Sequence, residues 1–400
     1  MAVATAPTLL VPDERIWVLA GVDPRDLTTN PVSAADEAAL LVTPPRLPAE
    51  LGEALRAAWR RVGPPGRLVT ADGPGLGGAR STELLEEPAE AEHHHGGDHG
   101  HAHHDGHGGM SHDEMMEVRG DPSADGLVME DIETVIGPIF AGLPAGLALT
   151  ATLDGDVACA LSPRTTPVAG LDPSAPITSR VARGQRRGWP ALAAVEAERA
   201  LSHLAWMAAF AARLGWDAIA DEAYDALAPL VGLPEAVLER GVEPSSPDAV
   251  ADLAARVEGA RTLRARLAGR GVLEDPGLGG IAARAGGAAV DARAGSVWYE
   301  PLGFRVLIRA EGDALGRTVL RVREAEAALR LAHAALARDG PGPHAPLPVE
   351  GPRGEVGATG WPVRDRELLH AASAVAAGQE WAAALATVWS FDPPAWEPAA

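Results

Sequence analysis

The chain has 400 residues but only one cysteine, Cys159, and no lysine. A single thiol forms no intrachain disulfide and cannot supply the four thiolates of a cysteine-ligated metal cluster. Long apolar runs are also missing: no stretch reaches about 18 residues without a charge, so we expect no membrane span. The start of the chain has no basic region followed by a signal-like apolar run, and a cytoplasmic location is therefore expected.

Positive charge is scarce. The 34 basic residues are all arginine, against 55 aspartates and glutamates, which gives a formal net charge of −21. Nucleic acids and anionic membrane surfaces bind mainly through clustered positive charge. The composition therefore excludes a nucleic-acid partner and favours a soluble globular protein.

Periodicity divides the chain into three parts. Residues 14–74 are predicted as a small α/β unit, with strands at Arg15–Ala20, Ala38–Thr43 and Arg67–Ala71 and a helix at Leu47–Val62. Residues 75–125 lose periodicity and are rich in His, Gly and Asp, which predicts a disordered linker. Residues 126–400 form a larger, mainly helical domain, so the predicted class is α+β.

Within the larger domain, Gly137–Val157 is predicted as a strand pair, with Leu147–Leu153 as a strand and a tight turn at Asp154-Gly155. A second strand pair is expected around Ser296–Ala310. Cys159 follows the first pair and is expected to be a small core residue. The predicted helices are Ala191–Leu214, Trp216–Val231, Pro247–Ala268, Leu315–Ala337 and Arg366–Ala386.

Five ordered segments resemble one known family. They are Gly137-Pro138 with Leu147–Leu153 and Asp154–Val157; Glu196, Arg199, Ser202, His203, Leu204 and Trp206; Gly280, Ala283–Gly286, Asp291 and Arg293; Gly312-Asp313 with Arg317, Arg321 and Glu324; and Glu350–Glu355. Together they resemble the large subunit of respiratory complex I (NADH-quinone oxidoreductase) that forms the floor of the quinone pocket, which is related to the nickel–iron hydrogenase large subunit. Residues 14–74 more faintly resemble the complex I subunit that normally holds the terminal iron–sulfur cluster.

The resemblance implies electron transfer to quinone, but key groups of that chemistry are missing. Where the family opens its hairpin with two histidines, this chain has Phe140 and Leu143-Pro144, and the following interval has no tyrosine. Quinone reduction needs proton donors within hydrogen-bond reach of the carbonyls. The cysteines for an iron–sulfur cluster or a nickel–iron centre are absent as well. We therefore expect neither centre, doubt quinone binding, and assign no catalytic residue.

The family-matched candidates for a cofactor site are Glu196, Arg199, His203 and Arg353. The matching histidine faces the cluster of a neighbouring subunit. Without a cluster, a buried and hydrogen-bonded His203 is favoured, with Glu196 and Arg199 around it. Arg353 is expected to fix its turn through Glu350 or Glu355. Arg317, Arg321 and Glu324 share one helical face, which predicts either a buried charge network at a subunit or domain contact or a solvated face.

Nine of the 13 histidines fall in one short tract: His93, His94, His95, His99, His101, His103, His104, His107 and His112. Imidazole beside carboxylate suits zinc, nickel and copper(II), so the tract is predicted to bind divalent metal, with nickel or zinc as the expected ion. The nearby Met110, Met115, Met116 and Met129 are weaker candidates as soft ligands. The alternative is a solvated linker whose histidines have no such use.

Three functional hypotheses follow. The first is a non-catalytic structural or assembly subunit of a complex I-like or hydrogenase-like machine, held at the inner membrane through partner subunits. The second is a nickel- or zinc-handling protein that acts through the histidine tract. In the third, the remnant cavity still binds quinone or a small oxidised substrate. Whether the chain is an enzyme stays open.

Overall fold

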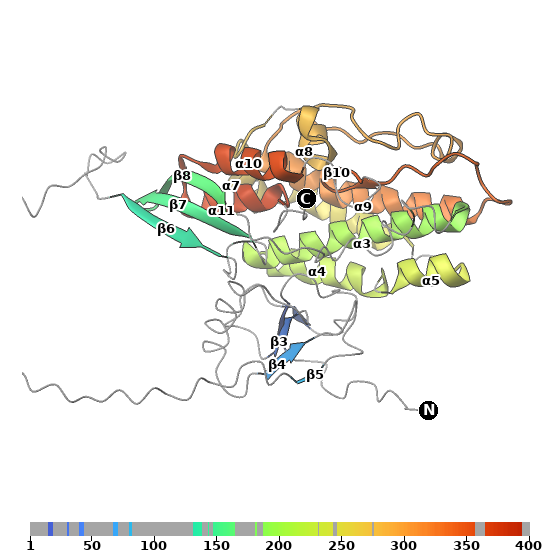
Figure 1. Ribbon diagram of the computed structural model, residues 1–400, viewed down its shortest axis with the longest axis horizontal. Helices are drawn as coiled ribbons and strands as arrows, with labels where there is room; N and C mark the ends of the chain where they lie inside the picture. The colour runs from blue at the N-terminus through green and yellow to red at the C-terminus, as the bar shows by residue number, and fades with distance from the viewer. Residues whose placement is uncertain are drawn as a thin grey trace, which may run out of the picture.

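The computed structural model describes five short N-terminal strands and most of the chain after residue 130 (Figure 1). The described residues beyond those strands are 131–137, 143, 147–164, 181, 187–230, 232–242, 246–273, 276–356 and 365–393. The histidine tract, the four methionines beside it and the predicted helix Leu47–Val62 lie outside the described residues. So do Phe140 and Pro144.

The N-terminal strands form one sheet in the order β2-β1-β3-β4-β5. Strand β1 (Arg15–Val18) pairs in parallel with β2 (Asn30–Pro31) and β3 (Leu40–Thr43), and β3 pairs in parallel with β4 (Arg67–Thr70). The three predicted strands therefore correspond to β1, β3 and β4, and parallel neighbours of this kind require crossover connections. Antiparallel β5 (Arg80–Ser81) extends the sheet beyond the predicted boundary at residue 74.

A second, antiparallel sheet has the order β11-β8-β7-β6. Strand β7 (Ala148–Asp154) pairs with β6 (Ile132–Ile136) and β8 (Val157–Arg164), and β8 pairs with β11 (Gln379–Glu380). The predicted turn at Asp154-Gly155 joins β7 to β8, and Gly155 has the positive φ of 58° that such a turn favours. Gly137 directly follows β6. A Cβ atom at this position would lie only 2.0 Å from the Leu147 carbonyl oxygen, so any residue with a side chain is excluded there.

Cys159 is exposed on β8, which corrects the prediction that it is a core residue. Side chains alternate between the two faces of a strand. Its neighbour Ala158 lies on the buried face of the sheet. There it packs in a core shared with α10 (Asp365–Ala376) and α11 (Trp381–Ser390). Cys159 therefore points away from that core.

Two long helices form the centre of the larger domain. Helix α3 (Trp189–Arg213) begins with Pro190 in its first turn and packs along α9 (Ala314–Leu336), as Figure 1 shows. Helices α4 (Asp217–Leu227) and α5 (Leu233–Arg240) cover α3, and α6 (Asp248–Gly259) covers α9. Because α3 is surrounded by these helices, nearly its whole circumference is buried and its sequence is apolar on most sides.

Three predicted helices are shorter than their periodicity suggested. Within the predicted helix Trp216–Val231, the α-helix α4 stops at Leu227. A 3-10 turn, η6 (Ala228–Leu230), follows it and contains Pro229. Pro247–Ala268 is two helices, α6 and α7 (Arg261–Leu267), because Ala260 takes an extended conformation. Arg366–Ala386 is α10 and α11, separated by Gly378 at φ 76° and by β11.

The prediction of a strand pair around Ser296–Ala310 is wrong. This segment contains one 3-10 turn, η8 (Glu300–Leu302), and is otherwise irregular. Its alternating apolar residues suggested strands, but Pro301 and the left-handed Gly303 impose a tight turn instead. The turn brings Trp298 and Tyr299 into the main core, where both are almost fully buried.

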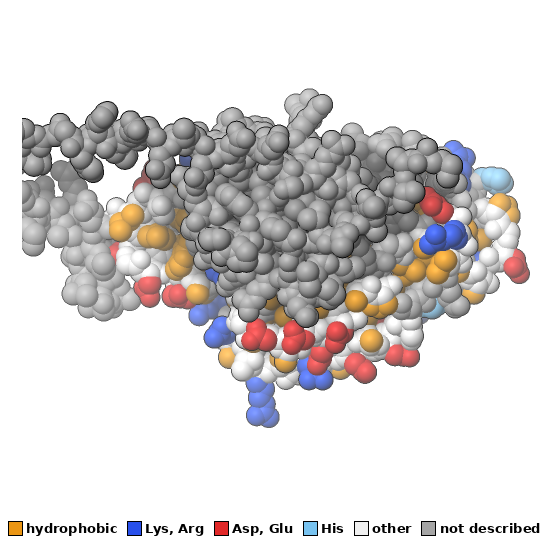
Figure 2. All heavy atoms as spheres, turned by 90° about the horizontal axis from the view of Figure 1, so that it is seen from below, with side chains coloured by type: hydrophobic (Ala, Val, Ile, Leu, Met, Phe, Trp, Pro, Cys, Tyr) orange, Lys and Arg blue, Asp and Glu red, His pale blue; other side chains and the backbone are white. Residues whose placement is uncertain are grey.

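In the part of the chain that the structure describes, no helix combines the length and the apolar character needed to cross a membrane. On the face drawn in Figure 2, acidic and basic side chains are interspersed among apolar ones along the edge of the described residues.

Candidate functional site: a buried charge cluster

Helices α3 and α9 bring charged side chains into the core where they face each other. On α3, Glu196, Arg199 and His203 follow steps of three and four residues, so they share one face of the helix. On α9, Arg321 and Glu324 do the same, and all five side chains are buried. The solvated alternative for the face of Arg317, Arg321 and Glu324 is therefore wrong, because all three side chains are buried. Glu324 joins the charge network described next, whereas Arg317 donates to the carbonyl oxygens of Gly271 and Gly312 and to the Ser390 hydroxyl. A place for this face at a subunit contact stays a prediction.

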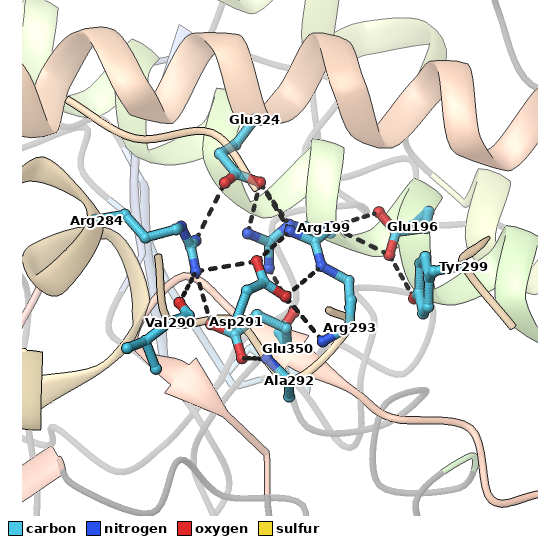
Figure 3. Close-up of polar contacts among 10 residues, drawn as sticks. All are labelled: Glu196, Arg199, Arg284, Val290, Asp291, Ala292, Arg293, Tyr299, Glu324 and Glu350. Carbon is cyan, nitrogen blue, oxygen red and sulfur yellow. Dashed lines mark hydrogen bonds and ion pairs between the residues drawn. The ribbon is translucent and has the colours of Figure 1, made fainter. Parts of the chain in front are cut away.

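Glu324 is the centre of this network (Figure 3). Its Oε2 atom accepts hydrogen bonds from Arg199 Nη2 at 2.7 Å and from Arg293 Nη2 at 3.1 Å. Its Oε1 atom forms an ion pair with Arg284 Nη2 at 3.2 Å. One carboxylate of α9 thus joins guanidinium groups from α3, from α8 (Gly280–Ala285) and from the loop that follows α8.

Arg293 holds two further carboxylates. Its Nε and Nη2 atoms donate to the two oxygens of Asp291 at 2.9 and 2.8 Å, a bidentate arrangement. Its Nη1 atom lies 3.2 Å from Glu196 Oε2, and Glu196 Oε1 accepts a 2.7 Å hydrogen bond from the Tyr299 hydroxyl. The Arg293 guanidinium also lies over the Phe304 ring, 4.4 Å from its centroid.

Glu350 closes the cluster from the other side. It begins β9 (Glu350–Gly351), which pairs with β10 (Gly354–Glu355). Its Oε1 atom accepts from Arg284 Nη1 at 2.9 Å, its Oε2 atom from the Ala292 N–H at 3.1 Å, and its carbonyl oxygen from Arg199 Nη1. We refer to this group as the charge cluster; its members are Glu196, Arg199, Arg284, Asp291, Arg293, Tyr299, Glu324 and Glu350.

Gly280 sets the distance between α8 and the turn that joins β9 to β10. It has a positive φ of 56°, and an added Cβ would lie 2.5 Å from the carbonyl carbon of Arg353 and 2.6 Å from the Pro352 carbonyl oxygen. The Ile281 N–H donates to that same Pro352 oxygen at 3.0 Å. Only glycine lets the two backbones meet this closely, and their contact places Arg284 opposite Glu350.

The surroundings shift the pKa values of the cluster in different directions. Burial would raise the pKa of Glu324, but Arg199, Arg284 and Arg293 outweigh it and hold the pKa well below its usual value. For Glu350 burial prevails despite Arg284, and its pKa is raised. Burial, followed by the charge of Glu196, raises the pKa of Tyr299 well above its usual value. Tyr299 is therefore a protonated donor and Glu324 an ionised acceptor.

His203 is buried as predicted, but its ring is not hydrogen-bonded as predicted: both ring nitrogens lack a partner among the described residues. Burial and then the charge of Arg199 lower its pKa well below the usual value, so the imidazole is neutral. Arg199 is near it, as expected, whereas Glu196 is engaged with Arg293 and Tyr299. Arg353 is half-buried in the turn between β9 and β10, and its pairing with Glu350 or Glu355 stays a prediction.

The network around Arg293 and Glu324 joins two of the four predicted cofactor-site residues, Glu196 and Arg199. His203 lies near Arg199 but outside this network, and Arg353 lies in the turn between β9 and β10. The other members of the network were not predicted as site residues, although Arg284, Asp291, Arg293 and Glu350 all lie in segments that carry the family resemblance. Tyr299 had a weaker signal, as one of only two tyrosines in the chain. Most of these pairings join segments that are distant in the sequence.

A four-thiolate metal centre does not fit this site, because the one cysteine of the chain is exposed on β8. Each carboxylate of the cluster already accepts hydrogen bonds from guanidinium, hydroxyl or backbone donors. This geometry is suited to joining α3, α8, α9 and β9 in a fixed arrangement. It offers no unpartnered carboxylate in the cluster for proton transfer to a substrate.

The chain is similar in fold to a chain of the structure described as the membrane-bound sulfane sulfur reductase (MBS), an archaeal respiratory membrane complex, with a TM-score of 0.50. The likeness covers 66% of this chain and 97% of that chain, at 17% sequence identity. Among curated proteins, no relative matches the chain.

A family comparison narrows the resemblance further. Residues 240–359 match the family described as respiratory-chain NADH dehydrogenase, 49 Kd subunit. The predicted resemblance to the complex I and hydrogenase large-subunit family is therefore confirmed. The matched range contains Arg284, Asp291, Arg293, Glu324 and Glu350. Glu196 and Arg199 on α3 lie outside it but bind residues inside it.

Proposed function

We propose that the chain is a non-catalytic structural or assembly subunit of a multi-subunit respiratory or hydrogenase-like complex, bound peripherally at a membrane through partner subunits. One observation carries this proposal: the family-matched charged side chains bind one another inside the chain. Arg199, Arg293 and Arg284 all reach Glu324, and the contacts fix four segments of the chain. The framework of the fold is kept, while the thiolates that would hold a redox centre are absent from the sequence.

Isolation of the chain from its native cells tests the proposal. A tag on the chain and mild detergent extraction should recover respiratory or hydrogenase-like subunits in fixed stoichiometry, in one band on a native gel. Recovery of the chain alone, under conditions that keep a known complex of the same cells intact, would contradict it. Retention of electron-transfer activity by a complex that lacks the chain would support a structural role over a catalytic one.

A second candidate function is nickel or zinc handling, favoured by the nine histidines between His93 and His112. Imidazoles interleaved with carboxylates at glycine-spaced positions allow several ligand sets to compete for one ion. Titration of the full chain with Ni²⁺ and Zn²⁺, beside a variant without residues 90–113, tests this function. Tight binding that disappears with the deletion supports it, and equal, weak binding by both proteins contradicts it.

A further inference from the structure

Two fully buried polar side chains beside the charge cluster have atoms without a hydrogen-bond partner in the part of the chain that the structure describes. They are His203 on α3, at both ring nitrogens, and Arg321 on α9, at Nε and Nη1. A buried donor or acceptor without a partner is unfavourable, and more so in a charged group. Two such groups on facing helices therefore point to an acceptor that binds between them.

The two side chains are close to each other. Trp206 follows His203 by one helical turn on α3, and the Arg321 guanidinium lies over the Trp206 ring, 4.7 Å from its centroid. Residues three apart on a helix are neighbours on its surface, so the guanidinium lies about one turn from the imidazole. The Arg321 charge is also among those that act on His203.

Among the described residues, Arg321 has one ion pair, with Asp392, whose Oδ2 atom lies 3.0 Å from Nη2. This contact accounts for one of the three guanidinium nitrogens. Asp392 follows the end of α11 at a positive φ of 52°, in the left-handed region that aspartate tolerates better than most residues other than glycine. Its side chain is 23% exposed, so Arg321 is nearest to solvent at this contact.

The unpartnered atoms of Arg321 are donors and need acceptors. Asp392 lies next to Nη2, and Glu324, whose charge acts on His203, is already shared among three guanidinium groups of the charge cluster. Nε and Nη1 of Arg321 therefore remain as donors without an acceptor. An oxyanion supplies acceptor oxygens without adding donors, whereas a water molecule also brings donors that need acceptors of their own.

We propose that Arg321 and His203 form a binding site for a small oxyanion of the carboxylate, phosphate or sulfate type. The planar guanidinium presents parallel N–H donors that match two oxygens of such an anion, and the neutral imidazole adds one N–H. Asp392 competes with the anion for Arg321 and leaves it when the anion binds. The site is separate from the charge cluster, whose carboxylates are already paired.

Calorimetric titration of the full chain with phosphate, formate and sulfate, each against a chloride background, tests this site. We expect one anion to bind per chain, and Arg321→Gln to weaken binding at least about ten-fold, since a charge-assisted hydrogen bond contributes about 1.5–3 kcal/mol. His203→Gln should weaken binding less. Arg330→Gln removes the same charge from an exposed position of α9 and should leave the affinity unchanged.

The same calorimetric titration is repeated with Asp392→Asn, which removes the competing carboxylate and should tighten anion binding several-fold. This variant keeps the test decisive if Arg321→Gln does not fold, as judged by circular dichroism. The proposal is overturned if none of the three anions binds, if Arg321→Gln binds as well as Arg330→Gln, or if Asp392→Asn binds no more tightly than the natural chain. None of these results depends on whether the chain belongs to a larger complex.

Discussion

Helix α9 carries ion pairs on two opposite sides, and the two sides differ in what surrounds them. On the inner side Arg321 and Glu324 are almost fully buried, and Glu324 serves three guanidinium groups. On the outer side Arg323 and Arg330 pair with Glu258 and Glu326 while keeping 34% and 56% of their side chains exposed. The residue types and distances are similar, but water screens only the outer pairs.

The comparison shows that an ion pair is not a fixed unit of stability. Exposed pairs contribute about 0–1 kcal/mol, because solvent screens them and the side chains lose entropy. Removing one partner of a buried pair costs about 3–5 kcal/mol, because the other charge is then left in the core without compensation. The inner pairs also join α3, α8 and α9 to one another. The outer pairs link residues whose positions the packing of the core already fixes.

The largest expected effect comes from Glu324→Gln. The amide would leave Arg199, Arg284 and Arg293 without their common counter-charge, so we expect the free energy of unfolding to fall by about 3–5 kcal/mol. Urea denaturation followed by circular dichroism measures this loss. Glu326→Gln, two residues further along the same helix, should cost less than about 1 kcal/mol. Equal losses for the two variants would remove the distinction between the two sides of α9.

Tyr299→Phe should have the next largest effect. It removes the hydroxyl that donates to Glu196 and leaves that buried carboxylate with Arg293 alone. A hydrogen bond to a charged group contributes about 1.5–3 kcal/mol, and the same denaturation experiment should show a loss in this range. A loss below about 0.5 kcal/mol would mean that water reaches Glu196 and replaces the hydroxyl, which a closed inner side does not allow.

The pH dependence of stability should show the effect of His203. Its pKa in the folded chain is well below the usual 6.5, so the unfolded chain takes up a proton first. The stability that this group contributes is therefore present above pH 6.5 and is lost as the pH falls below it, by up to about 1.4 kcal/mol per pH unit. Urea denaturation between pH 8 and 5, in chloride and cationic buffers, should give a shallower slope for His203→Gln. Parallel curves would refute the assignment.

The smallest effect is expected on the outer side of α9. Arg330→Gln breaks an exposed pair with Glu326 and should change the free energy of unfolding by no more than about 0.5 kcal/mol. This small difference should shrink further in about 1 M NaCl, where the Debye length is only about 3 Å. The loss caused by Glu324→Gln should respond much less to salt. If both variants responded equally, the inner side would not be shielded from solvent.

Much of this arrangement could be predicted from local patterns. Steps of three and four residues placed Arg317, Arg321 and Glu324 on one face of a helix, and apolar periodicity located α3 and α9. A single sequence does not say whether such a face is buried, because charged residues at helical spacing also occur on solvated faces. Burial was decided by the α3 side chains opposite, and Arg199 lies 125 residues from Glu324 along the chain.

The errors have local causes. Apolar residues between Ser296 and Ala310 alternate as in a strand, but Pro301 and Gly303 override that pattern. Cys159 was assigned to the core by residue type alone, whereas strand alternation places it outside. Tyr299 gave only a weak signal, its rarity as one of two tyrosines, and its partner Glu196 is 103 residues away along the chain.

The close contact at Gly280 also has a consequence for how the chain folds. The charge cluster forms only when α3, α8, α9 and β9 are all in place, and the contact from Arg199 to Glu350 spans 151 residues. Bringing such distant segments together costs loop-closure entropy before any ion pair compensates for it, which slows folding. The pairing of α3 with α9 carries the same kind of cost, because Arg199 and Glu324 are 125 residues apart. The meeting of Gly280 with the Pro352–Arg353 turn closes a shorter loop, but it completes the charge cluster only together with that pairing.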